Sequence, residues 1–276
     1  MKARDLAILG APTNLGNRPY EVDGTARQTT GLPRRLREAG IVRRLGARDL
    51  GDVAAAPYRD FVFVPGTIRN ADLVHVHARS IADAVAAHDG FTLVLGGDCS
   101  TILGCLAGLR RSRNDLAVVY FDAHDDFNTL ATTITGAGAG MDLAIATGRV
   151  ETPLARLDRR GPLLRDEDVV TVGVRERVVE DTPFRSASTA EGILAALGDR
   201  EFFIHVDADV LDPAFMPWVD SPTPGGLHPD DLASMLRALL ALPGAAGMEL
   251  TIYDPRNDRE GKGATLLVDI LAKAFA

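Results

Sequence analysis

Two short acidic segments of the chain carry the residue types from which proteins build metal sites. The segment DAHDD places Asp122, His124 and Asp126 at alternate positions, and the segment DAD places Asp207 and Asp209 two residues apart. Alternate side chains of an extended segment point to the same side, and carboxylates with one imidazole suit divalent ions such as Mn²⁺. A lone Asp-x-Asp would more simply cap a helix or form a turn. Two such segments offer more carboxylates than one ion needs, so we predict a two-metal site that could generate hydroxide near neutral pH.

Apolar runs and helical patterns alternate along the chain and position these segments. The expected strands span Leu6–Ala11, Phe91–Leu95, Leu116–Phe121, Val169–Val174, Phe202–Val206 and Gly247–Ile252. The expected helices span Ala71–Ala87, Ser100–Arg111, Ala190–Leu197, Pro229–Leu242 and Lys262–Phe275. This alternation predicts a three-layer α/β/α fold with a mainly parallel central sheet. Because ligand sites in such folds lie beyond the carboxyl ends of the strands, we expect both acidic segments, the GGDCS segment at 96–100 and Glu249 to meet at one edge.

The composition excludes several classes of protein. The 276 residues carry 30 lysines and arginines against 38 acidic residues, a net charge of −8, and no basic stripe, which argues against nucleic-acid binding. Two cysteines cannot make a disulfide scaffold. Because no apolar run approaches about 18 residues and the start does not resemble a signal peptide, we expect a cytoplasmic protein without a membrane anchor. No repeat or linker divides the chain, which predicts a single domain over residues 1–276.

Four segments, GGDCS, DAHDDFNT, HVDADVLDP and GMELTIYDP, resemble in order the signature blocks of the arginase/agmatinase (ureohydrolase) family. The resemblance spans Gly96 to Glu249. It implies an arginase-like fold and a binuclear manganese site whose bridging hydroxide attacks a guanidinium carbon and releases urea. It also implies a homo-oligomer, a trimer or a hexamer, that acts on a small guanidino amino acid.

The resemblance implies a role for each residue of the acidic segments. Asp122 and Asp207 match carboxylates that bridge both ions, and His124 and Asp209 match further ligands of one ion. Asp126 matches a ligand of the other ion, and it would also hydrogen-bond the attacking hydroxide. The expected catalytic residues are therefore Asp126 and Glu249, the latter as the carboxylate that pairs with the substrate guanidinium.

Other polar residues fall where the resemblance implies contacts with the substrate. Asn128 and Thr135 match residues that contact the amino-acid end, which favours an α-amino acid over a decarboxylated amine such as agmatine. Asp220 replaces a common glycine in a loop that borders the substrate in relatives. It could bind the ammonium group of the substrate, or it could be a solvated loop carboxylate. The expected substrate-binding residues are thus Asn128, Thr135, Asp220 and Glu249.

Two departures from the family pattern stand out. Cys99 replaces the histidine of the usual GGDHS, and we expect its thiolate to bind a metal ion, which would also admit divalent ions other than Mn²⁺. The alternative is a small, inert core cysteine. The histidine that shuttles protons in the family would fall at about Ala139. Nω-hydroxy-L-arginine hydrolases of this family are similar to the chain in both departures. His205 stands where the family often has serine, and it is not counted among the predicted ligands.

Together these features predict a metal-dependent amidinohydrolase. It would hydrolyse the guanidino group of L-arginine or Nω-hydroxy-L-arginine to ornithine plus urea or hydroxyurea. An agmatinase or another guanidino-acid hydrolase is the alternative within the same class. The alternative of another class is a metal-binding relative whose turnover is impaired by the changes at Cys99 and Ala139.

Overall fold

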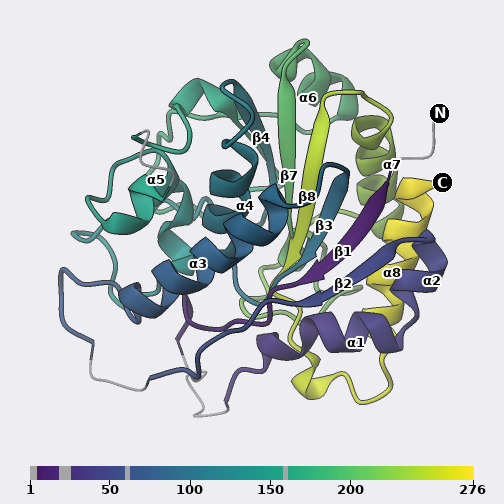
Figure 1. Ribbon diagram of the computed structural model, residues 1–276, viewed down its shortest axis with the longest axis horizontal. Coiled ribbons are helices and arrows are strands. Elements are labelled where there is room, and N and C mark those ends of the chain that lie inside the picture. The colour runs from purple at the N-terminus through teal and green to yellow at the C-terminus, as the bar shows by residue number, and fades with distance from the viewer. Residues whose placement is uncertain (1–4, 19–25, 60–62, 158–160) are drawn as a thin grey trace.

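A parallel sheet runs through the centre of the protein (Figure 1). The computed structural model describes residues 5–18, 26–59, 63–157 and 161–276. Eight strands lie in the order β2-β1-β3-β8-β7-β4-β5-β6, and every pair of neighbours is parallel. The strands are β1 (Leu6–Gly10), β2 (Arg48–Asp52), β3 (Phe91–Leu95), β4 (Leu116–Phe121), β5 (Val169–Val172), β6 (Arg185–Ser186), β7 (Glu201–Asp207) and β8 (Ala245–Thr251). The predicted parallel α/β fold is confirmed.

Helices cover both faces of the sheet (Figure 1). They are α1 (Leu32–Glu38), α2 (Ile41–Leu45), α3 (Ala71–Ala86), α4 (Thr101–Leu109), α5 (Asp142–Ala146), α6 (Ala190–Leu197), α7 (Pro229–Leu240) and α8 (Lys262–Phe275). One apolar core lies under α3, α4 and α5, and a second lies under the other five helices. The two cores account for the three layers, because each face of a buried sheet needs its own apolar cover.

The elements that the sequence predicted are those with a strong apolar pattern. The four central strands β3, β8, β7 and β4 are buried along almost their whole length, since only Glu201 at the start of β7 is exposed. Helix α7 begins at Pro229, and the Nδ1 atom of His228 accepts a hydrogen bond from the backbone N–H of Asp230. The edge strand β2 was not predicted, because all five of its residues are exposed and no apolar alternation marks it.

The four central strands deliver the functional loops to one edge of the sheet. Beyond these four strands the sheet continues through β1 and β2 on one side and through β5 and β6 on the other. Such a reversal of strand order opens a crevice at the carboxyl ends of the strands. The loop after β3 also packs closely on the loop after β1, because a Cβ atom on Gly97 would lie 1.7 Å from the carbonyl oxygen of Thr13. Only glycine therefore fits at position 97.

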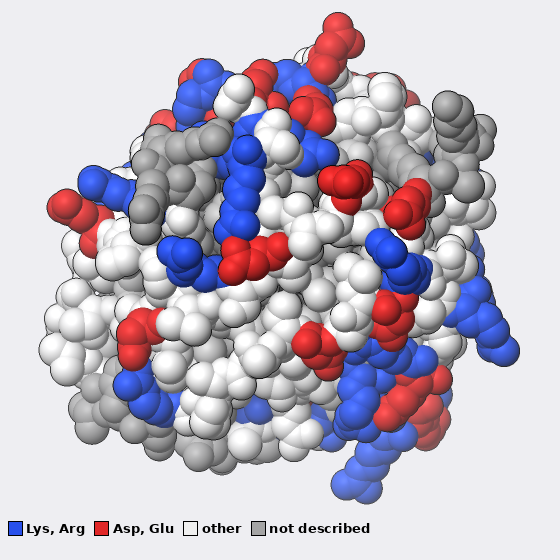
Figure 2. Space-filling view, in the orientation of Figure 1, with Lys and Arg blue, Asp and Glu red and all other residues white. Residues whose placement is uncertain are grey.

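Charged side chains of both signs lie beside one another on the face drawn in Figure 2. Ion pairs of the described residues include those of Arg37 with Asp49 and Asp52 and that of Arg44 with Asp269. In the part of the chain that the structure describes, no helix has the length and apolar character needed to cross a bilayer.

Candidate metal centre

A first group of ligand atoms forms where β4 and β7 end. The Nδ1 atom of His124 lies 3.0 Å from Oδ2 of Asp209 and 3.3 Å from Oδ1 of Asp122. Backbone N–H groups hold both carboxylates in place, since Ala123 donates to Asp209 and His124 donates to Asp122. Burial opposes a charge on His124, but the two carboxylates outweigh it and raise its pKa far above the ordinary value. Asp122, His124 and Asp209 thus present three ligand atoms within 4.8 Å of one another.

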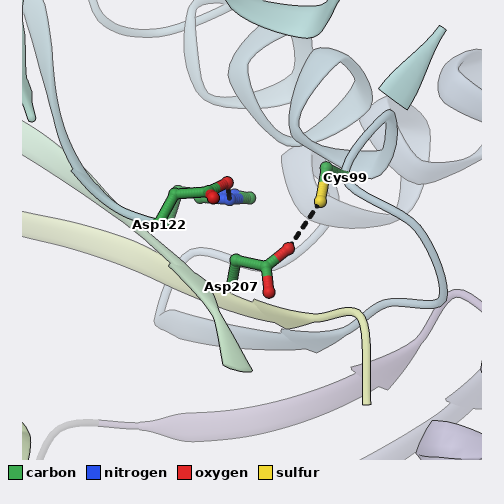
Figure 3. A group of neighbouring side chains, drawn as sticks. Cys99, Asp122 and Asp207 are labelled. Carbon is green, nitrogen blue, oxygen red and sulfur yellow. Dashed lines mark hydrogen bonds and ion pairs between the residues drawn. The ribbon is translucent and has the colours of Figure 1, made fainter. Parts of the chain in front are cut away.

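A second group lies next to the first and shares Asp122 with it. Ligand atoms of Cys99, Asp122, His205 and Asp207 lie within 4.8 Å of one another, and all four residues are buried. Figure 3 shows the Cys99 side chain, from the loop after β3, directed at Asp207 beside Asp122. The thiol donates a hydrogen bond to Oδ2 of Asp207 over 2.9 Å. Burial and the charge of Asp207 raise the pKa of the Cys99 thiol, so a cation would be needed to stabilise its thiolate.

A third group extends the site toward α5. Ligand atoms of Cys99, Asp126 and Asp142 also lie within 4.8 Å of one another. The Tyr120 hydroxyl lies between the two carboxylates, 2.9 Å from Oδ2 of Asp126 and 3.1 Å from Oδ1 of Asp142. Asp126 has a φ of 40°, a left-handed conformation that aspartate tolerates better than most residues.

The electrostatics of these groups fit divalent cations. Burial and neighbouring carboxylates raise the pKa values of Asp126, Asp142 and Asp207 well above the ordinary value, and that of Asp209 to about 6. Among the described residues, Oδ2 of the buried Asp122 has no hydrogen-bond partner. A buried carboxylate oxygen without a donor is costly, and a metal ion would supply the missing charge. The donor set of carboxylates, imidazoles and one thiol suits borderline divalent metals.

Glu249 is held differently from the arrangement that the resemblance implies. It lies within β8, is fully buried, and accepts hydrogen bonds from His205 Nδ1 over 2.7 Å and from Thr101 Oγ1 over 2.8 Å. The thiol of Cys105 lies 3.6 Å from the second oxygen. Pairing with a substrate guanidinium would require Glu249 to exchange these bonds.

The remaining predicted substrate residues lie in the surrounding loops. A Cβ atom on Gly140 would lie 3.8 Å from Asn128 Nδ2 and 3.9 Å from Asp126 Oδ1, so Asn128 borders the carboxylate cluster through Gly140. Thr135 is half-buried, and its hydroxyl accepts a hydrogen bond from the backbone N–H of Ala137.

Asp220 is not a solvated loop carboxylate. It forms an ion pair with the buried Arg27 and accepts a hydrogen bond from Asn17 over 2.9 Å. Ala139, where the family's shuttle histidine would fall, is buried and donates its N–H to the carbonyl of Gly16. The loop at 13–17 therefore contacts both Asp220 and Ala139.

All six residues predicted as metal ligands thus lie in one or more of the three groups. Tyr120 and Asp142 were not predicted as residues of the site, and His205 was noted but not predicted as a ligand. In the sequence, Asp142 looks like an ordinary acidic residue in the first turn of a helix. Tyr120 looks like a core residue of a buried strand. The sequence did contain an indication that His205 belongs to the site. It lies two residues before Asp207 on one strand, and therefore on the same face of the sheet.

Comparisons with known proteins identify the family of the chain. The pattern of the arginase family matches residues 4–276. Arginase from Bacillus caldovelox is 29% identical over 300 residues, which cover 99% of this chain and 98% of the relative. The Nω-hydroxy-L-arginine amidinohydrolase of Streptomyces lavendulae is 31% identical over 212 residues, covering 72% and 75% of the two chains. The solved structure of the Bacillus caldovelox arginase superposes with a TM-score of 0.88 at 26% identity, over 99% of this chain and 98% of that one. The chain therefore belongs to the arginase family, whose members are hydrolases that act on guanidino C–N bonds.

Proposed function

We propose that this protein is a metal-dependent amidinohydrolase with a binuclear, manganese-type centre. Its substrate would be L-arginine or Nω-hydroxy-L-arginine, and its products ornithine plus urea or hydroxyurea. The observation that carries the proposal is that two groups of candidate ligands share Asp122 at the carboxyl edge of the sheet. A shared carboxylate is how two ions are held close enough to act on one water.

The described residues divide naturally between two ions. Asp122, His124 and Asp209 would hold one ion, and Cys99, Asp122 and Asp207 would hold the other. Two divalent ions in these places would supply a nucleophilic water at neutral pH for attack on the guanidinium carbon.

Side chains beside the proposed metal centre would transfer the protons of the reaction. Asp126 would take the proton of the attacking water on Oδ1, because Oδ2 already accepts the Tyr120 hydroxyl. The same hydroxyl also contacts Asp142, so the two carboxylates that it links can share the proton accepted by Asp126. Asp142 follows Ala139 by three positions in the chain. The Tyr120–Asp126–Asp142 network would thus offer a route for protons where the family's shuttle histidine is absent.

The amino-acid end of the substrate would face the loops that carry Asn128, Thr135 and Asp220. Asn128 borders the Asp126 carboxylate through Gly140. Asp220 is already neutralised by Arg27, so it would contribute to ammonium recognition as part of an Asn17–Arg27–Asp220 network rather than as a free charge. The small side chain of Ala139 would leave room for the hydroxyl of Nω-hydroxy-L-arginine, the substrate named for the Streptomyces lavendulae relative.

A direct assay tests the proposal. The Mn²⁺-loaded protein is incubated with L-arginine, Nω-hydroxy-L-arginine and agmatine, and urea, hydroxyurea and the amine products are quantified. We expect turnover of an α-amino-acid substrate and little turnover of agmatine. Preferred turnover of agmatine would favour the agmatinase alternative. No turnover of any of the three by protein with measured bound metal would favour the catalytically impaired relative. Assembly into a trimer or hexamer and a cytoplasmic location remain predictions.

A further inference from the structure

His205 is a buried imidazole beside the proposed metal centre. It is fully buried within β7, and its Nδ1 atom lies 2.7 Å from Glu249 Oε1. Its other nitrogen, Nε2, lies 3.8 Å from Asp122 Oδ2, and neither of these two atoms has a hydrogen-bond partner within the described ranges. Two buried polar atoms that face one another at this distance leave a place for a shared partner.

We propose that His205 is a ligand of the second metal ion and that Glu249 is the carboxylate that orients it. This inference rests on the proposed binuclear centre. The second ion would then be held by Cys99, Asp122, His205 and Asp207, whose ligand atoms already lie within 4.8 Å of one another. It gives Glu249 a role in positioning a ligand, in place of the contact with the substrate guanidinium that the sequence predicts.

The contacts around His205 select the form of imidazole that binds a metal. A proton on Nδ1 donates to Glu249 and leaves the lone pair of Nε2 directed at the site. Metal-binding histidines usually donate their other N–H to a carboxylate or carbonyl in this way. Thr101 donates to the second oxygen of Glu249 and fixes the carboxylate in turn.

The sheet also holds the ring rigidly. His205 and Glu249 are register partners on β7 and β8. On the other side of His205, Tyr120 stacks on the imidazole with ring centroids 4.1 Å apart and ring planes 9° apart. A ring confined by a stacked neighbour and a hydrogen-bonded carboxylate loses little entropy on binding a metal ion.

The chemistry of Cys99 explains why a histidine is useful here. The resemblance places an imidazole at position 99, where this chain has a thiol. A thiolate and two carboxylates would put three negative charges on one ion, which weakens it as a Lewis acid. His205 would contribute a neutral nitrogen ligand from β7. The second ion would then have one imidazole ligand even though position 99 carries a thiol.

The competing explanation is that His205 is a protonated cation that pairs with Asp122 and Glu249 and needs no ion. Metal content separates the two. By inductively coupled plasma mass spectrometry we expect two ions per chain in the wild-type protein and one in His205→Phe, which keeps a ring for Tyr120 but has no ligand atom. His228→Asn is the matched control, because this exposed histidine caps α7 and asparagine also caps helices. It should retain two ions.

A spectroscopic experiment leaves His205 intact and so does not depend on that variant folding. We would label the histidines with ¹⁵N, load His124→Ala with Mn²⁺, and record electron spin-echo envelope modulation. With His124 removed, a ¹⁵N coupling to the bound Mn²⁺ is expected from His205, and it should disappear in the double variant His124→Ala/His205→Phe. A Mn²⁺-loaded His124→Ala protein without a ¹⁵N coupling would overturn the inference.

Glu249→Gln tests the positioning role. The amide oxygen can still accept the Nδ1 proton but carries no charge, and mutation of such a partner typically weakens metal binding about 10- to 100-fold. We expect this loss at one of two sites in calorimetric titrations, with the other site unchanged. Equal affinity at both sites would refute the role of Glu249. Two ions in both wild type and His205→Phe would refute the inference alone, whereas fewer than two ions in the wild type would refute the binuclear centre itself.

Discussion

The ring of Tyr120 stacks on the imidazole of His205, while its hydroxyl contacts Asp126 and Asp142. One side chain of β4 thus supports a proposed metal ligand with its face and orders two carboxylates with its hydroxyl. The two functions of Tyr120 can be separated by mutation, because phenylalanine keeps the stacking and loses the hydrogen bonds.

Tyr120→Phe should lower kcat while leaving the metal content unchanged. A hydrogen bond to a charged group contributes about 1.5–3 kcal/mol, which corresponds to about a 10- to 100-fold loss of rate if it acts in the transition state. Steady-state kinetics would measure the effect, with KM expected to change little. Tyr120→Ala, which also removes the stacked ring, should in addition lose metal. If Tyr120→Phe keeps the wild-type kcat, the hydroxyl has no part in proton transfer.

Cys99 should tilt the metal preference toward softer ions. Thiolate ligands favour Zn²⁺ and Co²⁺ over Mn²⁺ more strongly than imidazole does, so Cys99→His should shift competition between Zn²⁺ and Mn²⁺ toward Mn²⁺. The ratio of the two metals bound after equilibration with a fixed mixture would measure the shift. The Co²⁺-loaded wild type should also show a thiolate-to-cobalt absorption band that Cys99→Ser lacks. An unchanged ratio and unchanged spectra would rule out ligation by Cys99, and Cys105→Ser, on the neighbouring helix α4, is a matched thiol control.

Removal of metal should destabilise the fold. The buried carboxylates Asp122, Asp207 and Asp209 and the half-buried Asp126 lie in neighbouring groups of candidate ligands. A ligand that binds only the native state stabilises it by about 2.7 kcal/mol per site at a hundredfold excess over Kd. Dialysis against a chelator should therefore lower Tm, and added Mn²⁺ should restore it. Asp122→Asn, which weakens both proposed sites, should reduce the response to added Mn²⁺ more than Asp207→Asn does. A Tm that is insensitive to the chelator in a protein shown to lose metal would contradict this prediction.

A pH-dependent contribution to stability is expected away from the site, at Asp168. Burial raises the pKa of this carboxyl, but hydrogen bonds from Arg165 and Arg200 outweigh burial and lower it below the ordinary value. Because the native pKa is lowered, the stabilisation is present above the unfolded pKa of about 3.9 and is lost as the pH falls through the native value.

Urea unfolding of Asp168→Asn tests this expectation. The variant should be about 1–3 kcal/mol less stable than the wild type at pH 7 and pH 5, and the difference should shrink below about pH 4. Asp166→Asn is the matched control in the same turn, since Asp166 pairs with the partly exposed Arg149 and should contribute less than about 1 kcal/mol. A difference that persists unchanged at low pH would show that packing, not charge, explains the effect of Asp168.

The sequence by itself determined the layers of the fold and the main candidate ligands of the site. Continuous apolar runs such as Phe91–Leu95 and Leu116–Phe121 predict strands buried on both faces, and the structure has both with these bounds. Alternation within DAHDD and DAD then places Asp122, His124, Asp207 and Asp209 on a common edge. These features are local, so periodicity and spacing reveal them.

The tertiary structure decided which residues surround those ligands. His205 and Glu249 are 44 positions apart in the chain, and they meet because β7 and β8 are neighbours in this register. Tyr120 reaches His205 because β4 lies on the other side of β7. Strand order and register depend on how all the helices pack over the sheet, a property of the whole chain that no local pattern encodes. A buried histidine opposite a buried glutamate is therefore visible only once the strands are assembled.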